Sequence, residues 1–82
     1  MAAIADPDLF EALRDVRLRL ARERGVPPYV IFHDTTLRDM AEHRPASLND
    51  LHGIYGVGAK KAADFGEAFL EAIRRFCAAT TG

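Results

Sequence analysis

The sequence has 82 residues, of which 49% are hydrophobic and 28% are charged, and it carries a net charge of −1. This length predicts a single domain, the apolar fraction argues against a disordered segment, and the near-neutral charge excludes a uniformly basic nucleic-acid-binding domain. No apolar run approaches the roughly 20 residues of a membrane-spanning helix. The single cysteine, Cys77, excludes an internal disulfide and is typical of a reducing compartment.

The first helix is predicted over residues 7–24. Asp6 is placed to cap its beginning, Pro7 suits its first position, and Gly25 suits its end. An apolar face recurs at helical spacing and consists of Leu9, Leu13, Val16 and Leu20. Two prolines at positions 27 and 28 remove backbone donors, so the helix cannot continue through them.

A short apolar run over residues 30–32 comes next. Because the sequence holds no second strand-like run to pair with it, we interpret it as a buried connector. Asp34 is placed to cap a second helix over residues 35–43, and Pro45 ends that helix.

A short third helix is predicted over residues 48–53, with Ser47 as its cap and with Leu48 and Leu51 buried. A glycine-rich turn follows, and a last helix begins at Ala59. Gly66 lies inside this last helix and is a candidate point for a kink or a division. Four or five helices without strands predict a small all-α bundle.

The ends of the chain carry no usable pattern. We expect flexible ends at residues 1–5 and 78–82, with the domain itself spanning residues 6–77.

The glycine-rich turn resembles a phosphate-binding loop only superficially. In a P-loop, Ser or Thr follows the lysine, whereas no hydroxyl follows Lys60 or Lys61. Gly56 and Gly58 lead directly into a helix start, whose free backbone N–H groups can hold a DNA phosphate without reading sequence, with the two lysines adding charge. The alternative is that the glycines only close a tight turn.

The first helix carries a second candidate for nucleic-acid binding. Residues 14–24 hold five arginines and two acids, a local charge of +3, and Tyr29 follows on a stiff proline turn. A protein that binds single-stranded nucleic acid uses cationic side chains such as arginine to contact phosphates and aromatic rings on which the bases stack. We therefore select Arg17, Arg22, Arg24 and Tyr29. The alternative is a solvated surface with Tyr29 packed inward.

No catalytic, cofactor-binding or metal-binding arrangement is predicted. The three histidines are nine or ten residues apart, which is not a ligand spacing on a helix, and no nucleophile–base arrangement is suggested. The last helix carries Asp64, Glu67 and Glu71, with i, i+4 pairs between Lys60 and Asp64 and between Glu71 and Arg75. These acids would repel phosphate, and they are candidates for a surface that faces a protein.

The ordered motifs resemble those of the HRDC domain family, named for its occurrence in RecQ-type helicases and RNase D exonucleases. The resemblance covers residues 8–76 and is closer to the bacterial RecQ branch than to RNase D. It is carried by Val26-Pro27-Pro28-Tyr29-Val30-Ile31-Phe32, Asp34-x-Thr36-Leu37, Gly56-Val57-Gly58 and Phe65-Gly66-x-x-Phe69-Leu70. His33 departs from the family, which has a small residue there, and the net charge is less basic than in members that bind DNA well.

The resemblance implies a compact five-helix, SAM-like fold and a non-catalytic accessory role in a longer, RecQ-type ATP-dependent DNA helicase. It implies weak binding of single-stranded or partly duplex DNA without sequence specificity, and modulation of helicase targeting in DNA repair and recombination. The implied DNA-binding residues are Tyr29, the nearby arginines, Lys60 and Lys61. A monomeric, cytoplasmic, nucleoid-associated bacterial protein is expected.

The near-neutral charge keeps a second function open. In that alternative the domain docks on another domain of its parent helicase through the acidic residues Asp64, Glu67 and Glu71, and does not itself bind DNA appreciably.

Overall fold

The first helix, α1 (Pro7–Arg24), begins and ends where the sequence predicts. The Asp6 carboxylate accepts a hydrogen bond from the Leu9 N–H at 3.1 Å, which satisfies one of the unpaired donors at the helix start. Gly25 ends the helix in the left-handed conformation, with φ at 66°, and its N–H points back to the last turn. Leu9, Leu13 and Val16 are buried, so the predicted apolar face is the one that packs inward.

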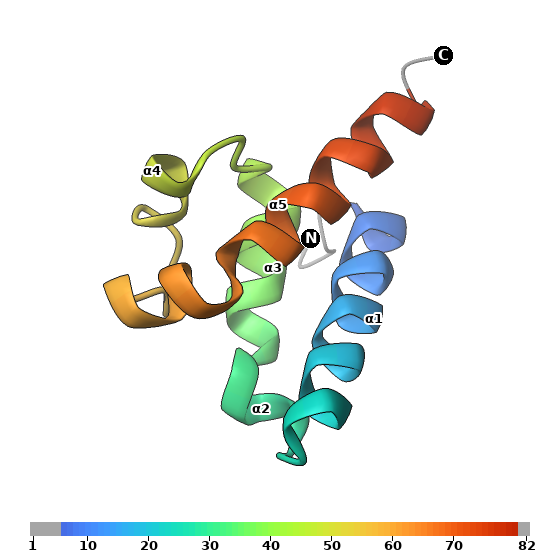
Figure 1. The fold of residues 1–82 in the computed structure, drawn as a ribbon. Coiled ribbons are helices and arrows are strands. Elements are labelled where there is room, and N and C mark those ends of the chain that lie inside the picture. Colours follow the sequence, from blue (N-terminus) through green and yellow to red (C-terminus); the bar gives the residue numbers. More distant parts are fainter. Residues whose placement is uncertain (1–5, 81–82) are drawn as a thin grey trace.

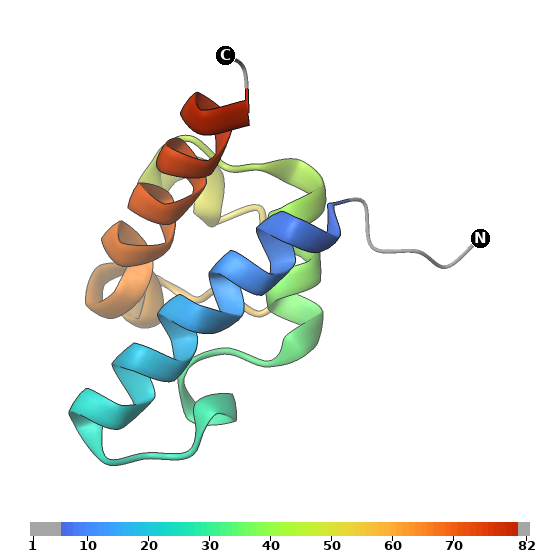
Figure 2. The ribbon, with the colours of Figure 1, turned by 90° about the vertical axis from the view of Figure 1, so that its right-hand side faces the viewer.

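The computed structural model describes residues 6–80, and it shows an all-α bundle with no strand in that range, as predicted. Figure 1 shows α1 beside α3, with α5 crossing them and α2 at the end where the first helix turns back. In Figure 2, α1 packs between α5 on one side and α3 on the other. Besides α1, the helices are α2 (Pro28–Ile31), α3 (Asp34–His43), α4 (Leu48–Leu51) and α5 (Ala59–Thr80).

The core is organised around Phe32, which is almost fully buried between α2 and α3. Its ring meets the rings of Phe65 and Phe69 on α5 edge-on, with centroids 6.1 and 5.2 Å apart. Such pairs add to the burial energy about 0.5–1.5 kcal/mol each. Among residues 6–80, no helix has the length and apolar character that a membrane crossing requires.

The segment that we interpreted as a connector is in fact a short helix. Pro28 occupies the first position of α2, where its missing N–H costs nothing. Ile31 and Phe32 are buried as expected, whereas Val30 is exposed. The residue preceding α3 is His33, so Asp34 is the first residue of the helix and not its cap, and no side chain caps this end.

α4 is shorter than predicted and ends at Leu51. Ser47 caps it as predicted, accepting the Asp50 N–H at 3.1 Å. Leu48 is 40% exposed, which contradicts its predicted burial. The Leu48 and Leu51 side chains instead lie against Gly66, where an added Cβ would be 2.8 and 2.9 Å from them.

Gly66 therefore serves a close approach between α4 and α5, and it does not divide α5, which is one continuous helix. α5 continues to Thr80, so the tail that we expected to fray from residue 78 is helical up to that point. The predicted flexible residues 1–5, 81 and 82 lie outside the described part of the chain.

Candidate nucleic-acid interface

Two exposed tyrosines line one groove on the surface. Tyr29 on α2 is 59% exposed, and Tyr55 in the turn before α5 is 72% exposed. The groove has a volume of about 690 Å³ and lies between α2, the start of α3 and this turn. Its lining consists of Arg17, Pro28, Tyr29, His33, Asp34, Thr35 and Tyr55.

Tyr29 is held outward by its own short helix. Two of the next three residues, Ile31 and Phe32, are buried and anchor the segment, whereas the ring of Tyr29 is left in solvent. The ring stacks on that of His33, with centroids 6.0 Å apart and an interplanar angle of 30°. The alternative in which Tyr29 packs inward is therefore wrong.

Tyr55 was not selected from the sequence. Its backbone N–H donates to Asp39 Oδ2 at 2.8 Å, which fixes the turn against α3. Gly56 adopts a left-handed conformation with φ at 82°, and a Cβ there would overlap the Thr36 hydroxyl. An aromatic residue within a glycine-rich turn, outside every apolar stripe, was the available signal for this exposed ring.

Arg17 corrects the predicted DNA-binding set, because it is only 8% exposed. Its Nη1 donates to the Phe32 carbonyl at 3.0 Å and pairs with Asp34 Oδ1 at 2.7 Å. The hydrogen bond from Arg17 lowers the pKa of Asp34, and the charges of Arg17, Arg14 and Arg38 lower it further. Arg17 thus ties α1 to the α2–α3 junction and is not available as a surface phosphate contact.

Two of the predicted cations converge beside α2. Lys61 Nζ donates to the Val30 carbonyl at 2.9 Å and lies 5.9 Å from the centroid of the Phe32 ring. The Arg24 guanidinium lies 4.6 Å from the centroid of Phe65, the edge-on partner of Phe32. Arg22 is also exposed, but it lies two residues before Arg24, about 160° around the helix axis, and so faces away from Arg24. Arg24 and Lys61 together are called the basic rim below.

Lys60 does not join the basic rim. Neighbouring residues on a helix point about 100° apart, so Lys60 faces away from Lys61. Lys60 is 89% exposed along its side chain and pairs with Asp64 at 3.3 Å. It therefore lies on the acidic face of α5.

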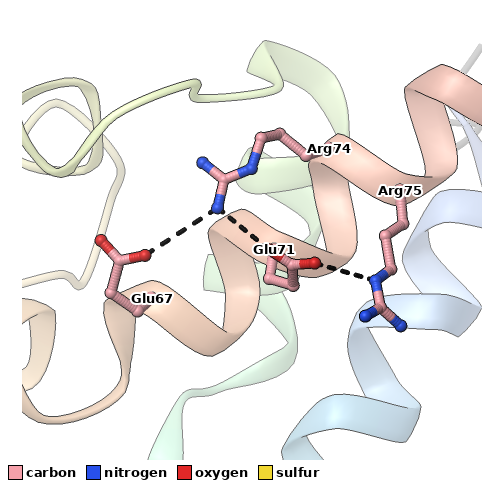
Figure 3. Close-up of polar contacts among 4 residues, drawn as sticks. All are labelled: Glu67, Glu71, Arg74 and Arg75. Carbon is pink, nitrogen blue, oxygen red and sulfur yellow. Dashed lines mark hydrogen bonds and ion pairs between the residues drawn. The ribbon is translucent and has the colours of Figure 1, made fainter.

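The acidic face of α5 is neutralised by its own cations. Figure 3 shows Arg74 reaching Glu67 and Glu71, at 3.9 and 3.1 Å, and Arg75 reaching Glu71 at 2.8 Å. Hydrogen bonds from Arg74 and Arg75 lower the pKa of Glu71. The predicted pairs between Lys60 and Asp64 and between Glu71 and Arg75 are confirmed. The face is consequently charge-balanced and not strongly negative.

The glycine-rich turn has some, but not all, of the features expected of a phosphate contact. Gly58 precedes α5, and its carbonyl accepts the Ala62 N–H at 2.9 Å. The first N–H groups of such a helix have no partner within the helix. However, the two lysines that follow it are turned to different partners, toward Val30 and toward Asp64. Phosphate contact at Gly56 and Gly58 stays a prediction.

One acidic cluster offers metal-ligand atoms among the described residues. Asp39, Glu42 and His43 bring such atoms within 4.8 Å of one another. Asp39 Oδ2 already accepts the Tyr55 N–H, and His43 Nδ1 lies 3.1 Å from both Asp39 Oδ1 and the Asp39 backbone carbonyl oxygen. These contacts give the cluster a structural role in fixing the Tyr55 turn.

Comparison with known proteins identifies the family. Residues 6–73 match the model of the HRDC domain. The chain is 45% identical over 80 residues to the ATP-dependent DNA helicase RecQ of Bacillus subtilis, covering 96% of this chain but only 14% of that protein. It is 41% identical over 69 residues to the Haemophilus influenzae helicase of the same name, covering 84% of this chain and 11% of that protein.

Solved structures agree with this assignment. The third HRDC domain of Deinococcus radiodurans RecQ superposes with a TM-score of 0.83 at 37% identity, covering 85% of this chain and 92% of that one. The HRDC1 domain of the same organism's RecQ helicase gives a TM-score of 0.63 at 46% identity, covering 89% and 97%. The fold, the motifs and the family match together establish that this chain belongs to the HRDC domain family.

Proposed function

We propose that this HRDC domain is a non-catalytic accessory domain of a RecQ-type ATP-dependent DNA helicase. In this proposal it binds single-stranded or partly duplex DNA weakly and without sequence specificity, and thereby modulates where the helicase acts in DNA repair and recombination. The relatives support the parent assignment, because the chain corresponds to about a seventh of the Bacillus subtilis RecQ helicase.

The observation that carries the proposal is the exposed ring of Tyr29 beside the basic rim. Lys61 on α5 donates a hydrogen bond to the carbonyl of Val30, the residue next to Tyr29, so a cation lies beside the short helix that carries the stacking surface. Base stacking on an aromatic ring contributes about 1–3 kcal/mol per base and tolerates every sequence. The combination favours unpaired bases with adjacent phosphates.

The same surface predicts weak binding. Engaging the basic rim neutralises about two phosphates, for which log K falls with log salt at a slope of about −1.4 for a single strand. The neutralised face of α5 adds no attraction for phosphate, and the net charge of −1 gives no long-range steering. A high affinity at physiological salt is therefore not expected.

Fluorescence anisotropy with a labelled single-stranded oligonucleotide, at two salt concentrations, tests the proposal. Tyr29→Ala combined with Arg24→Ala should weaken binding at least about 5-fold. Arg74→Ala is the charge control, because it removes one positive charge from the charge-balanced face of α5. Absence of binding at low salt, or equal losses in the control and the double variant, would refute the proposal.

The alternative, docking on another domain of the parent helicase through Asp64, Glu67 and Glu71, has less support. The cations Lys60, Arg74 and Arg75 already pair with these acids. Deletion of the domain from the parent would favour the alternative if helicase activity changed while the isolated chain bound no DNA.

A further inference from the structure

We infer that Tyr55 forms the second wall of a pocket that takes one unstacked base of single-stranded DNA, opposite Tyr29. This inference rests on the proposed function. It assigns a second contact with DNA to Tyr55, which lies in the turn before α5 and not on α2. The two rings are the two large aromatic side chains most exposed among the described residues, and both line the same groove.

The groove has the size and lining that such a ligand needs. Its volume of about 690 Å³ falls within the range of roughly 300–1,000 Å³ that is typical of small-ligand sites. Tyr29, His33 and Tyr55 supply ring faces, and Thr35 supplies a hydroxyl for the polar edge of a base. A duplex keeps its bases stacked, so this lining selects an unpaired base.

The backbone segments that carry both walls are held in place before a ligand arrives. The Tyr55 turn is held to α3 by the bond from its N–H to Asp39, at 2.8 Å. The Tyr29 helix is held from two sides, by Lys61 on the Val30 carbonyl and by Arg17 on the Phe32 carbonyl. A preformed site loses little conformational entropy on binding, which raises the affinity that each stacking contact can provide.

Cations flank the groove where phosphates would lie. Arg38 lines an adjoining groove of about 460 Å³ that shares Thr35 and Tyr55 with the first. The carboxylates Asp39 and Glu42 line this adjoining groove as well, so Lys61 is the stronger candidate for a phosphate contact. On the other side, Lys61 lies next to Tyr29 through its bond to Val30. The one carboxylate in the lining of the first groove, Asp34, is paired with Arg17 at 2.7 Å, which reduces its repulsion of a phosphate.

The composition of the chain makes a direct test available. The sequence contains two tyrosines and no tryptophan, so its intrinsic tyrosine fluorescence reports on this groove alone. In Tyr29→Phe the emission comes only from Tyr55, and in Tyr55→Phe it comes only from Tyr29. Phenylalanine keeps a ring for stacking, so both variants should retain binding.

We expect oligodeoxythymidylate of about 15 nucleotides to quench both single-tyrosine variants with the same dissociation constant. Tyr55→Ala should raise that constant about 5- to 10-fold by anisotropy. An abasic oligonucleotide of equal length should bind Tyr55→Ala and the unchanged chain equally, because it offers phosphates without bases. The exposure of Tyr55 makes a folding defect unexpected, and circular dichroism checks this.

The outcomes separate the pocket from the proposed function. Quenching of Tyr29 with unchanged Tyr55 emission, or an unchanged dissociation constant in Tyr55→Ala, overturns the pocket and leaves DNA binding at Tyr29 intact. A flat anisotropy titration of the unchanged chain at low salt overturns the proposed function as well.

Discussion

Replacing Arg17 distinguishes a structural arginine from a DNA contact. Arg17→Met keeps most of the buried stem but leaves the Phe32 carbonyl without its donor at 3.0 Å. A buried acceptor that loses its partner costs about 1–3 kcal/mol. The other partner, Asp34, is half-exposed and regains water, so breaking the ion pair adds about 0–1 kcal/mol. We therefore expect Arg17→Met to lower the free energy of unfolding by about 2 kcal/mol, and Asp34→Asn by less than about 1 kcal/mol.

Urea unfolding followed by circular dichroism measures these changes, and its pH dependence adds a second check. Because the folded-state pKa of Asp34 is lowered, its contribution to stability is present above the unfolded pKa, about 3.9, and is lost as pH falls through the folded value. This loss on acidification should be smaller in Arg17→Met, since the first cause of the shift is gone.

DNA binding by Arg17→Met completes the test. Where the variant is fully folded, its salt slope should equal that of the unchanged chain, because Arg17 contacts no phosphate. A stability change below about 0.5 kcal/mol, together with a slope reduced by about 0.7, would refute the structural role and restore Arg17 to the interface.

Further substitutions check the packing and the division of the two lysines. Gly66→Ala should lower the free energy of unfolding by about 1–3 kcal/mol, because the new Cβ meets Leu51 Cδ1 at 2.9 Å. This loss is expected although alanine has a better helix propensity than glycine, and an increased Tm would contradict it. Ser47→Ala removes the α4 cap and should cost about 1 kcal/mol in urea unfolding, whereas no loss would show that α4 is held by packing alone. Lys61→Ala should reduce the salt slope of DNA binding by about 0.7 and Lys60→Ala should leave it unchanged, and equal effects would contradict the separation of these lysines.

Local signals explain what could be predicted from the sequence. The bounds of α1 follow from Asp6 and Gly25, which act on backbone groups within their own turn. Ser47 could be assigned as a cap for the same reason. The exposure of Tyr29 follows from its place in a stiff proline segment, because the apolar residues that follow it are the ones that pack into the core.

Contacts between distant segments explain which features could not be predicted from the sequence. The burial of Arg17 depends on the Phe32 carbonyl, which is fifteen residues away along the chain. A helical wheel compares only residues of one helix and therefore does not show this contact. The groove at Tyr55 is assembled from α2, α3 and the turn before α5, and none of these segments carries the signal alone. Both Lys60 and Lys61 were predicted to bind DNA, although the 100° step between them and the i, i+4 spacing of Lys60 and Asp64 could have separated them.

The measurement that tests the account most directly is the salt-dependent anisotropy titration of this 82-residue chain and its Tyr29→Ala variant with single-stranded DNA. We predict weak binding at low salt, a slope of about −1.4, and a dissociation constant raised at least about 5-fold by the substitution. Binding that is absent at low salt, or that is the same with and without the Tyr29 ring, would contradict it.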